Sequence, residues 1–386
     1  MQALPDPADS GGGAVTGTAR LQVGGVRPDG TRPVTGTDDA GLLLRGEVGP
    51  EPYASGPAAR PLTAAEAARI VAIAGRAPSV HNTQPWRFRE SGTAIDLLAD
   101  YGRQLTETDP AGRELLISCG AAVFGLRLGF RSLGRMPAVD VLPARDQPAL
   151  IAHVRVAGQA PVTRHESELL TAVYHRHTHR GPFTPGEIAP RLVEWLRTDA
   201  ITERAELVVL ADPAQTAWVG GLVRSAAAAQ AGRPEIAAEL RRWARSAASP
   251  AHDGVPAFAR GEYPAEPAAP GRAAEPEFRL PQRDFGEPGT APGGGSPPAL
   301  TAVLTTAGDS RADWIAAGQA LHRILLHAAT RWVFASLQSQ PLELPELRAE
   351  LRARLDLPGM PQMLLQLGRS NTAGATPRRP VTETLN

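Results

Sequence analysis

The sequence predicts an α+β fold in which helices flank mixed β-sheets in two consecutive units. Segments with a helical apolar period alternate with short apolar runs that are typical of strands. Two long helical segments share a local pattern of small residues before an apolar stripe, Gly120-Ala121-Ala122-Val123 and Gly318-Gln319-Ala320-Leu321. Small residues at these points permit close approach of two helices, and the shared pattern is a weak indication of a repeat.

The first 60 residues are rich in Gly, Pro, Thr and Asp and show no apolar period, so we expect an N-terminal extension that is disordered. Folded structure should begin at Leu62-Thr63, because Thr63 followed by Glu66 forms a capping box. We expect a first unit over residues 61–160. Its expected elements are a helix at 64–75, a strand at 94–99, a helix at 113–133, and strands at 139–142 and 152–156.

A second unit is expected over residues 161–386. Its expected helices cover residues 165–174, 188–197, 214–230, 235–246 and 314–334, and its expected strands cover 207–210, 300–305 and 361–367. Residues 248–298 are dense in Pro and Gly and form a long excursion within this unit. A segment of that length inside a compact domain is functional or disordered, so a lid over a pocket and plain disorder both stay open.

Bulk composition excludes few classes of protein. The 386 residues have a formal net charge of zero, which gives no field that would attract nucleic acid or an anionic membrane. No apolar run reaches membrane-spanning length, and the N-terminus has no basic segment followed by an apolar one. The single cysteine, Cys119, cannot form an internal disulfide, and a cytoplasmic location fits best. The sequence contains no lysine, so any cationic contact to a phosphate must come from arginine.

The segment Arg176-His177-Thr178-His179-Arg180 has two faces. If it is extended, Arg176, Thr178 and Arg180 point to one side and could bind a dianionic phosphate. Residues 175, 177 and 179 are histidines on the opposite side and could ligate zinc or copper, although the flanking arginines would repel a cation. An exposed basic loop is the third interpretation.

A second polar segment, residues 78–86, could frame a flat ring with polar edges. Pro78 and Pro85 stiffen the backbone, while Ser79, Asn82 and Gln84 offer short hydrogen-bonding groups. An irregular connection between a helix and a strand is equally compatible with this composition. A further basic pair, Arg378-Arg379, follows the last expected strand and on its own resembles a frayed tail.

Together these motifs resemble the nitroreductase family over residues 61–386. The matching segments are Thr63-Ala64-Ala65-Glu66, Ala77-Pro78-Ser79, Asn82, Gln84-Pro85-Trp86-Arg87-Phe88, the 176–180 segment and Phe183. The family's arginine motif has Arg-Arg-Ser-x-Arg, where this chain has His177 and Thr178 in place of the second Arg and the Ser. The sequence is most similar to the Acg-like branch, in which two nitroreductase units are joined in one chain as an intramolecular pseudo-dimer.

The resemblance implies one FMN site shared by the two units. Arg176, Thr178, Arg180 and one or both of Arg378 and Arg379 would hold the phosphate. From the first unit, Pro78, Ser79, Asn82 and Gln84 would contact the ring and ribityl chain. The turn Pro341-Leu342-Glu343 matches the family's turn whose backbone donates to the flavin nitrogen N5.

The implied function is an FMN-dependent oxidoreductase that uses NAD(P)H and reduces a small acceptor. No catalytic side chain or metal is required, because the flavin carries the chemistry. The alternative is a protein that binds or sequesters flavin with little turnover. We expect no nucleic-acid or membrane partner, and a monomer, because the pseudo-dimer would already be intramolecular.

Overall fold

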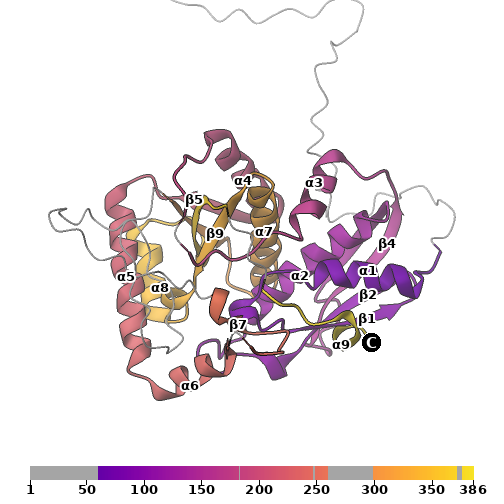
Figure 1. Ribbon diagram of the computed structural model, residues 1–386, viewed down its shortest axis with the longest axis horizontal. Coiled ribbons are helices and arrows are strands. Elements are labelled where there is room, and N and C mark those ends of the chain that lie inside the picture. The colour runs from indigo at the N-terminus through magenta and orange to yellow at the C-terminus, as the bar shows by residue number, and fades with distance from the viewer. Residues whose placement is uncertain (1–59, 182, 247, 260–298, 372–375) are drawn as a thin grey trace, which may run out of the picture. The chain divides into compact units, whose positions relative to one another are not determined.

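The structure is a computed structural model that describes residues 60–181, 183–246, 248–259, 299–371 and 376–386 (Figure 1). The disorder predicted for residues 1–60 lies outside this range except for residue 60. Of the segment 248–298, which we expect to be either a lid or disordered, only residues 248–259 are described.

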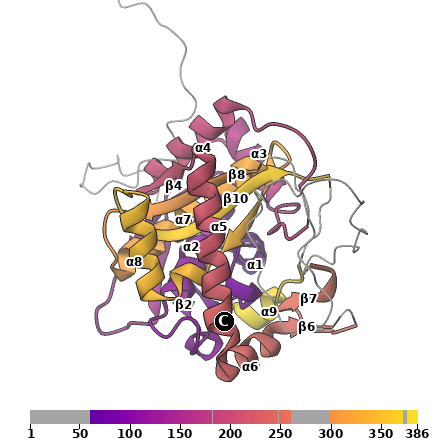
Figure 2. The same cartoon turned by 90° about the vertical axis from the view of Figure 1, so that its left-hand side faces the viewer.

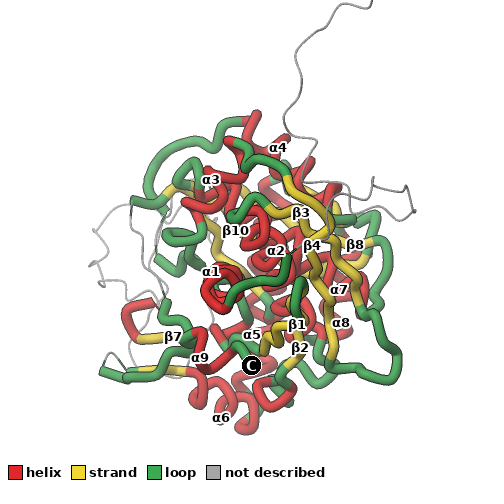
Figure 3. The backbone as a smooth tube through the Cα atoms, turned by 90° about the vertical axis from the view of Figure 1, so that its right-hand side faces the viewer, coloured by secondary structure: helices red, strands yellow, loops and turns green. Residues whose placement is uncertain are grey.

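The first sheet is antiparallel, with strands in the order β1-β2-β4-β3. Its strands are β1 (Trp86–Ser91), β2 (Ala94–Ala99), β3 (Arg135–Val141) and β4 (Leu150–Gln159). Trp86 and Phe88 alternate with exposed neighbours along β1 and are fully buried. Helix α2 (Arg113–Arg131) packs on this sheet, and α1 (Ala64–Ala74) packs on α2 (Figure 3).

The second sheet is also antiparallel, in the order β5-β8-β10-β9. Its strands are β5 (Ala205–Val209), β8 (Leu300–Thr306), β9 (Val333–Gln338) and β10 (Met360–Arg369). Its helices are α4 (Pro190–Thr202), α5 (Pro213–Ala231), α7 (Arg311–Ala329) and α8 (Pro345–Arg354). Leu304 and Leu365 pack against α4 and α7, whereas Val303 and Leu364 pack against α5 and α8 (Figure 2). Both faces of this sheet are therefore covered by helices.

The two sheets share one connectivity. In each, the long helix follows the second strand, and the fourth strand inserts between the second and the third. The helices of the two sheets, α2 and α7, pack closely. A Cβ atom added at Gly120 would lie 2.1 Å from the Ile315 carbonyl oxygen, and one added at Gly318 would lie 2.0 Å from that of Ile117. This contact confirms the close helix approach predicted from the small residues.

The segment 376–386 belongs to the second half of the chain but pairs with the first sheet. It contains α9 (Val381–Thr384), which lies beside β1 (Figure 1). Leu385 forms a parallel bridge with Phe88, and the Asn386 N–H donates to the Phe88 carbonyl at 2.9 Å. This parallel pairing at the edge of β1 gives the first sheet a mixed character, and the predicted α+β class is confirmed.

The remaining described elements precede the first sheet, separate the two sheets or lie between strands of one of the sheets in sequence. They are α3 (Arg164–Ala172), α6 (Pro234–Trp243), β6 (Ala244–Arg245), β7 (Val255–Pro256) and short 3-10 turns, among them Val80–Asn82 and Gln340–Leu342. The capping box of Thr63 and Glu66 is present as predicted. In the part of the chain that the structure describes, no helix is both long and apolar enough to cross a membrane.

The predicted bounds of α4, α6, α7, β3 and β4 differ from the structure by three or more residues, and several short elements were missed. The helix expected over 314–334 is α7, which ends at Ala329 because Trp332 adopts a left-handed backbone with φ of 56°. Strand β9 begins directly afterwards. Strands β1, β6, β7 and β9 and helices α8 and α9 were not predicted, since most of them are short and follow turns.

Candidate functional site

The connection between α1 and β1 has a strained backbone. His81, Asn82 and Gln84 adopt left-handed φ angles of 45°, 56° and 49°. Such angles are rare outside glycine and persist only where the surroundings impose them. Residues 78–85, which we call the loop 78–85, therefore have a shape that other parts of the protein must maintain.

Two distant segments hold this loop. The Asn82 amide donates to the carbonyls of Gly254 and Pro377, both at 3.0 Å. The Gln84 amide donates to the His252 carbonyl at 2.8 Å and accepts from the Arg379 N–H at 2.9 Å. The side chains of Asn82 and Gln84 are thus occupied by protein groups, and neither lines the cavity described below. For these two residues the structure supports a role in shaping the loop rather than the predicted direct contact.

The segment 176–180 runs along the edge of β9. Thr178 forms a parallel bridge with Ala335, and the His179 N–H donates to the Ala335 carbonyl at 2.8 Å. This extended backbone gives the two predicted faces. On one of them, the ring of His177 lies 4.4 Å from that of Phe334, and His179 stacks on Phe183 at 4.8 Å. These two histidines pack among aromatic rings.

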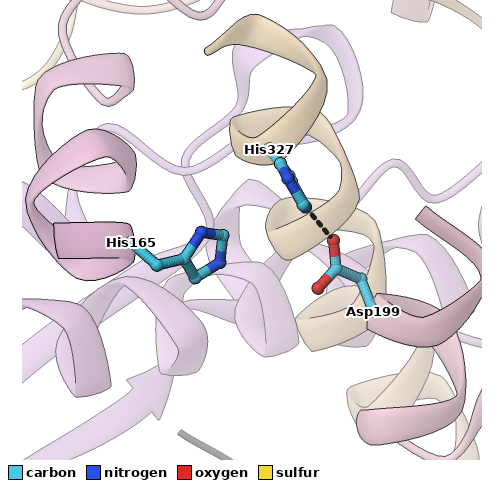
Figure 4. Close-up of side chains that lie close together, drawn as sticks. All are labelled: His165, Asp199 and His327. Carbon is cyan, nitrogen blue, oxygen red and sulfur yellow. Dashed lines mark hydrogen bonds and ion pairs between the residues drawn. The ribbon is translucent and has the colours of Figure 1, made fainter. Parts of the chain in front are cut away.

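Another group of side chains has ligand atoms within 4.8 Å of one another, namely His165, Asp199 and His327 (Figure 4). His327 Nδ1 lies 2.6 Å from Asp199 Oδ2, and Arg323 Nε donates to Asp199 Oδ1 at 2.7 Å. Two ligands of a tetrahedral zinc ion are roughly 3.3 Å apart at ordinary bond lengths. The distance from His327 Nδ1 to Asp199 Oδ2 is shorter than this, and the Arg323 guanidinium is adjacent to the same carboxylate. Both observations favour a buried ion-pair network between α4 and α7 over a zinc site.

Four guanidinium groups converge beside the opposite face of the segment 176–180. This arginine cluster consists of Arg76, Arg176, Arg180 and Arg378. Burial and the charges of Arg76 and Arg180 lower the pKa of Arg176 to about 10, and burial does the same for Arg180. Burial and the other three guanidinium groups lower the pKa of Arg378 well below its usual value. The charges that act on Arg176 and Arg378 are all positive, so an anion would stabilise the cluster.

The cluster also has unused hydrogen-bond donors. Arg176 Nε and NH1 and Arg378 Nε are buried without a partner among the described residues. Arg176 NH2 donates to the Arg76 carbonyl at 3.2 Å, and Arg378 NH1 donates to Asn82 Oδ1 at 3.0 Å. Asn82 therefore acts on the cluster by holding Arg378 in place.

Arg379 points away from the cluster. Its guanidinium donates to the Glu383 carbonyl at 3.1 Å and to the Gln84 carbonyl at 3.4 Å. Of the two arginines at 378 and 379, only the first joins the other three.

A cavity opens between the loop 78–85 and the segment 176–180. Its space free of atoms is about 730 Å³, open solvent at the mouth included. Pro78, Ser79, Thr178 and Arg180, four of the residues predicted to contact a shared ligand, line it. Residues of α2, α7, β10 and the region around β9 also form the wall. Segments about one hundred residues apart in the sequence therefore face one space.

Glu343 does not line this cavity. Its carboxylate accepts from Ser339 Oγ and from Gln230 Nε2, both at 2.6 Å, and its N–H donates to the Ser339 carbonyl at 3.1 Å. The predicted contact through Glu343 is thus replaced in this structure by a role in fixing the turn 339–343. Ser339 and Gln340 from the same turn are the residues that reach the cavity.

Sequence analysis missed several residues of the site. Arg76 directly precedes the predicted loop, and its position there was the only available signal. Glu114 and Ser118 are four apart on α2, where helical spacing places them on one face, and both line the cavity. His322 of α7 is fully buried, and its Nδ1 lies 2.7 Å from the Ala121 carbonyl oxygen.

The sequence was compared with known proteins. No model of a protein family matches it. Two similar proteins of Mycobacterium tuberculosis (strain ATCC 25618 / H37Rv) each carry the name "Putative NAD(P)H nitroreductase". One, Rv3131, is 31% identical over 330 residues, which are 81% of this chain and 89% of the relative. The chain belongs to the nitroreductase family. The other, acg, is 28% identical over 322 residues, which are 81% of this chain and 93% of the relative.

The resemblance of this nitroreductase to the Acg-like branch is confirmed by the second relative. Among solved structures, a nitroreductase with bound FMN from Desulfitobacterium hafniense DCB-2 aligns with a TM-score of 0.36 and 14% identity. The alignment covers 57% of this chain and 97% of that one.

Proposed function

We propose that this nitroreductase-family protein is an FMN-binding oxidoreductase that takes electrons from NAD(P)H and reduces a small acceptor. A single flavin would bind in the cavity between the loop 78–85 and the segment 176–180. The observation that carries this proposal is the arginine cluster, whose buried guanidinium groups repel one another, in which Arg176 and Arg378 have unused donors, and whose member Arg180 lines that cavity.

The chemistry of the cluster fits the phosphate of FMN. A phosphomonoester is close to a dianion at neutral pH and offers three acceptor oxygens, which planar guanidinium groups bind in pairs. Arg176, Arg180, Arg378 and Arg76 would hold it, with the Thr178 hydroxyl as a further donor. Two guanidinium groups would suffice for charge neutrality, so the whole cluster favours strong retention of the cofactor.

The remainder of the cavity fits a flat, mainly apolar ring with polar edges. Ile117, Leu321, Leu337 and Met363 provide apolar walls, and Ser79, Ser118, Ser339 and Gln340 provide polar groups between them. When bound, FMN supplies the hydride and electron transfer. The residues of the chain bind and orient the cofactor and exclude water from it.

We also propose that the protein is an intramolecular pseudo-dimer of two fused units, over residues 61–160 and 161–386. The shared strand order of the two sheets and the close contact of α2 with α7 support this division. One chain would then supply both halves of the flavin site, and we expect a monomer in solution and no nucleic-acid or membrane partner.

One observation favours the alternative of flavin sequestration. Residues 252–259 contact both sides of the site: the Gly254 N–H donates to the Asn82 carbonyl at 3.2 Å, and Arg180 NH1 donates to the Ala259 carbonyl at 3.3 Å. A segment fixed in this way would restrict the access of nicotinamide to the flavin. Flavin storage with little turnover is therefore the second candidate.

Two measurements separate these functions. Purified protein reconstituted with FMN should retain about one flavin per chain, released on acid treatment. Anaerobic NADH or NADPH should then bleach the flavin absorbance if the protein is a reductase. Bleaching by dithionite but by neither nicotinamide would favour storage, and protein that retains no flavin would contradict both functions.

A further inference from the structure

Gln340 combines three features that point to a ligand. It follows β9 at the start of the turn 339–343, it lines the cavity, and its side chain is almost fully buried at 2% exposure. Its amide nitrogen Nε2 has no hydrogen-bond partner among the described residues. A buried donor without an acceptor lowers the stability of a protein, so such a group indicates a partner that arrives from outside.

The position of Gln340 is fixed by its neighbours. Ser339 donates to the Glu343 carboxylate, which also accepts from Gln230 at 2.6 Å. Leu342, in the same turn, is buried against α5 and α8. Because the turn is anchored on both sides, Gln340 presents its amide at a defined place in the cavity wall.

Gln340 lies beyond the part of β9 that pairs with the segment 176–180. Thr178 pairs with Ala335, and β9 then continues to Gln338 before the turn begins. Three residues of strand cover about 10 Å, so the turn that contains Gln340 begins about that far from the Thr178 pairing. A cofactor whose phosphate is at the cluster would therefore have its ring near Gln340.

We propose that Gln340 binds the pyrimidine edge of the flavin ring, with its Nε2–H donating to a ring carbonyl oxygen. This role rests on the proposed flavin site. The pyrimidine edge carries carbonyl oxygens beside an N–H group, and a primary amide can donate to the first and accept from the second. The carbonyl oxygens are more electron-rich in reduced flavin, so donation by Gln340 favours the reduced cofactor.

The test compares Gln340→Leu with wild type, both reconstituted with FMN. The variant should bind oxidised FMN about tenfold more weakly, because one hydrogen bond is lost. Its two-electron reduction potential should be lower by about 30 mV, which corresponds to a tenfold change in the affinity ratio of reduced to oxidised flavin. The flavin-free variant should be at least as stable as wild type, because an unpaired buried amide has been removed.

Gln338→Leu is the matched control. Gln338 is 1% exposed at the end of β9, and its Oε1 is also buried without a partner among the described residues, but its Nε2 donates to Ser336 Oγ at 3.2 Å and it does not line the cavity. This variant should keep the wild-type FMN affinity and potential. Gln340→Met repeats the test with an unbranched side chain, in case leucine disturbs the packing.

The outcomes distinguish the two levels of the proposal. If wild-type protein retains FMN but Gln340→Leu and Gln340→Met keep its affinity and potential, the role of Gln340 is overturned and the flavin site stands. Equal losses in Gln340→Leu and Gln338→Leu would also overturn it, because they would indicate a general packing effect. If wild-type protein retains no FMN, the proposed function and this role fail together.

Discussion

Some single residues of the site lower the stability of the ligand-free protein. Arg176 is 5% exposed, and its pKa is lowered to about 10 by burial and by the neighbouring guanidinium groups. The sequence predicted Arg176, Arg180 and Arg378 for one cluster through the family resemblance. It could not predict that Arg379 turns away from its neighbour Arg378, because both follow the same strand and differ only in their tertiary contacts.

Replacing Arg176 with methionine should weaken FMN binding by ten- to a hundredfold, since a hydrogen bond to a charged group contributes about 1.5–3 kcal/mol. The free energy of unfolding of the flavin-free protein should stay the same or rise, because one repelling buried charge is removed. Isothermal titration with FMN and urea denaturation measure the two effects.

Arg379→Met is the control for this variant. It removes donors to the carbonyls of Gln84 and Glu383, so stability should fall by about 1 kcal/mol while FMN affinity changes little. Equal FMN affinity in Arg176→Met and wild type would contradict the assignment of the cluster to the phosphate.

His177 should make the protein sensitive to acid. Burial, His179 and the nearby arginines lower its pKa from 6.5 to about 4, despite the hydrogen bond to the His175 carbonyl. Between these values the unfolded chain binds a proton that the folded protein does not, so stability is lost as the pH falls from 6.5 to 4. The contribution of His177 should be about 3 kcal/mol at most, and the total loss should be smaller by that amount in His177→Phe, whose ring can pack on Phe334. Denaturation curves of flavin-free protein at pH 7 and pH 4.5 test this, and parallel losses in both proteins would refute it.

At the scale of elements, periodic segments were predictable and short ones were not. Strand β2 and the helices α1 and α2 agree with the sequence to within two residues, because each carries a clear period or a capping box. Strand β9 was assigned to the preceding helix, since Val333 and Phe334 continue an apolar stripe and the left-handed turn at Trp332 has no glycine to mark it.

Gly318→Ala should disrupt the contact between α2 and α7. The added methyl group would meet the Ile117 carbonyl oxygen at 2.0 Å, and backbone cannot move aside as a flexible side chain can. We expect a loss of about 3 kcal/mol or more in the free energy of unfolding. Gly221→Ala on α5, where the nearest atom is Arg224 NH2 at 3.9 Å, should instead stabilise by up to about 1 kcal/mol. Similar changes in the two variants would show that helix propensity, and not the contact, decides the result.

At the scale of the whole molecule, the sequence predicted which segments share the site but not how they are joined. The family motifs indicated that the loop 78–85 and the segment 176–180 face one ligand, and the structure places both on one cavity. The contacts from residues 252–254 to Asn82 and Gln84 were not predictable, because they lie in a stretch rich in Pro and Gly that has no apolar period. Backbone hydrogen bonds of this kind leave no pattern in the residue types.

Because Arg378 belongs to the cluster, the cluster is completed late in the synthesis of the chain. During translation, residue 76 leaves the ribosome long before residue 378. The cluster therefore stays incomplete while roughly three hundred further residues are translated. Arg378 completes the cluster when its guanidinium donates to the Asn82 amide oxygen. If the cluster holds the phosphate of FMN as proposed, the flavin site is complete only after translation has passed residue 378, and FMN would not be a template for the early-emerging half.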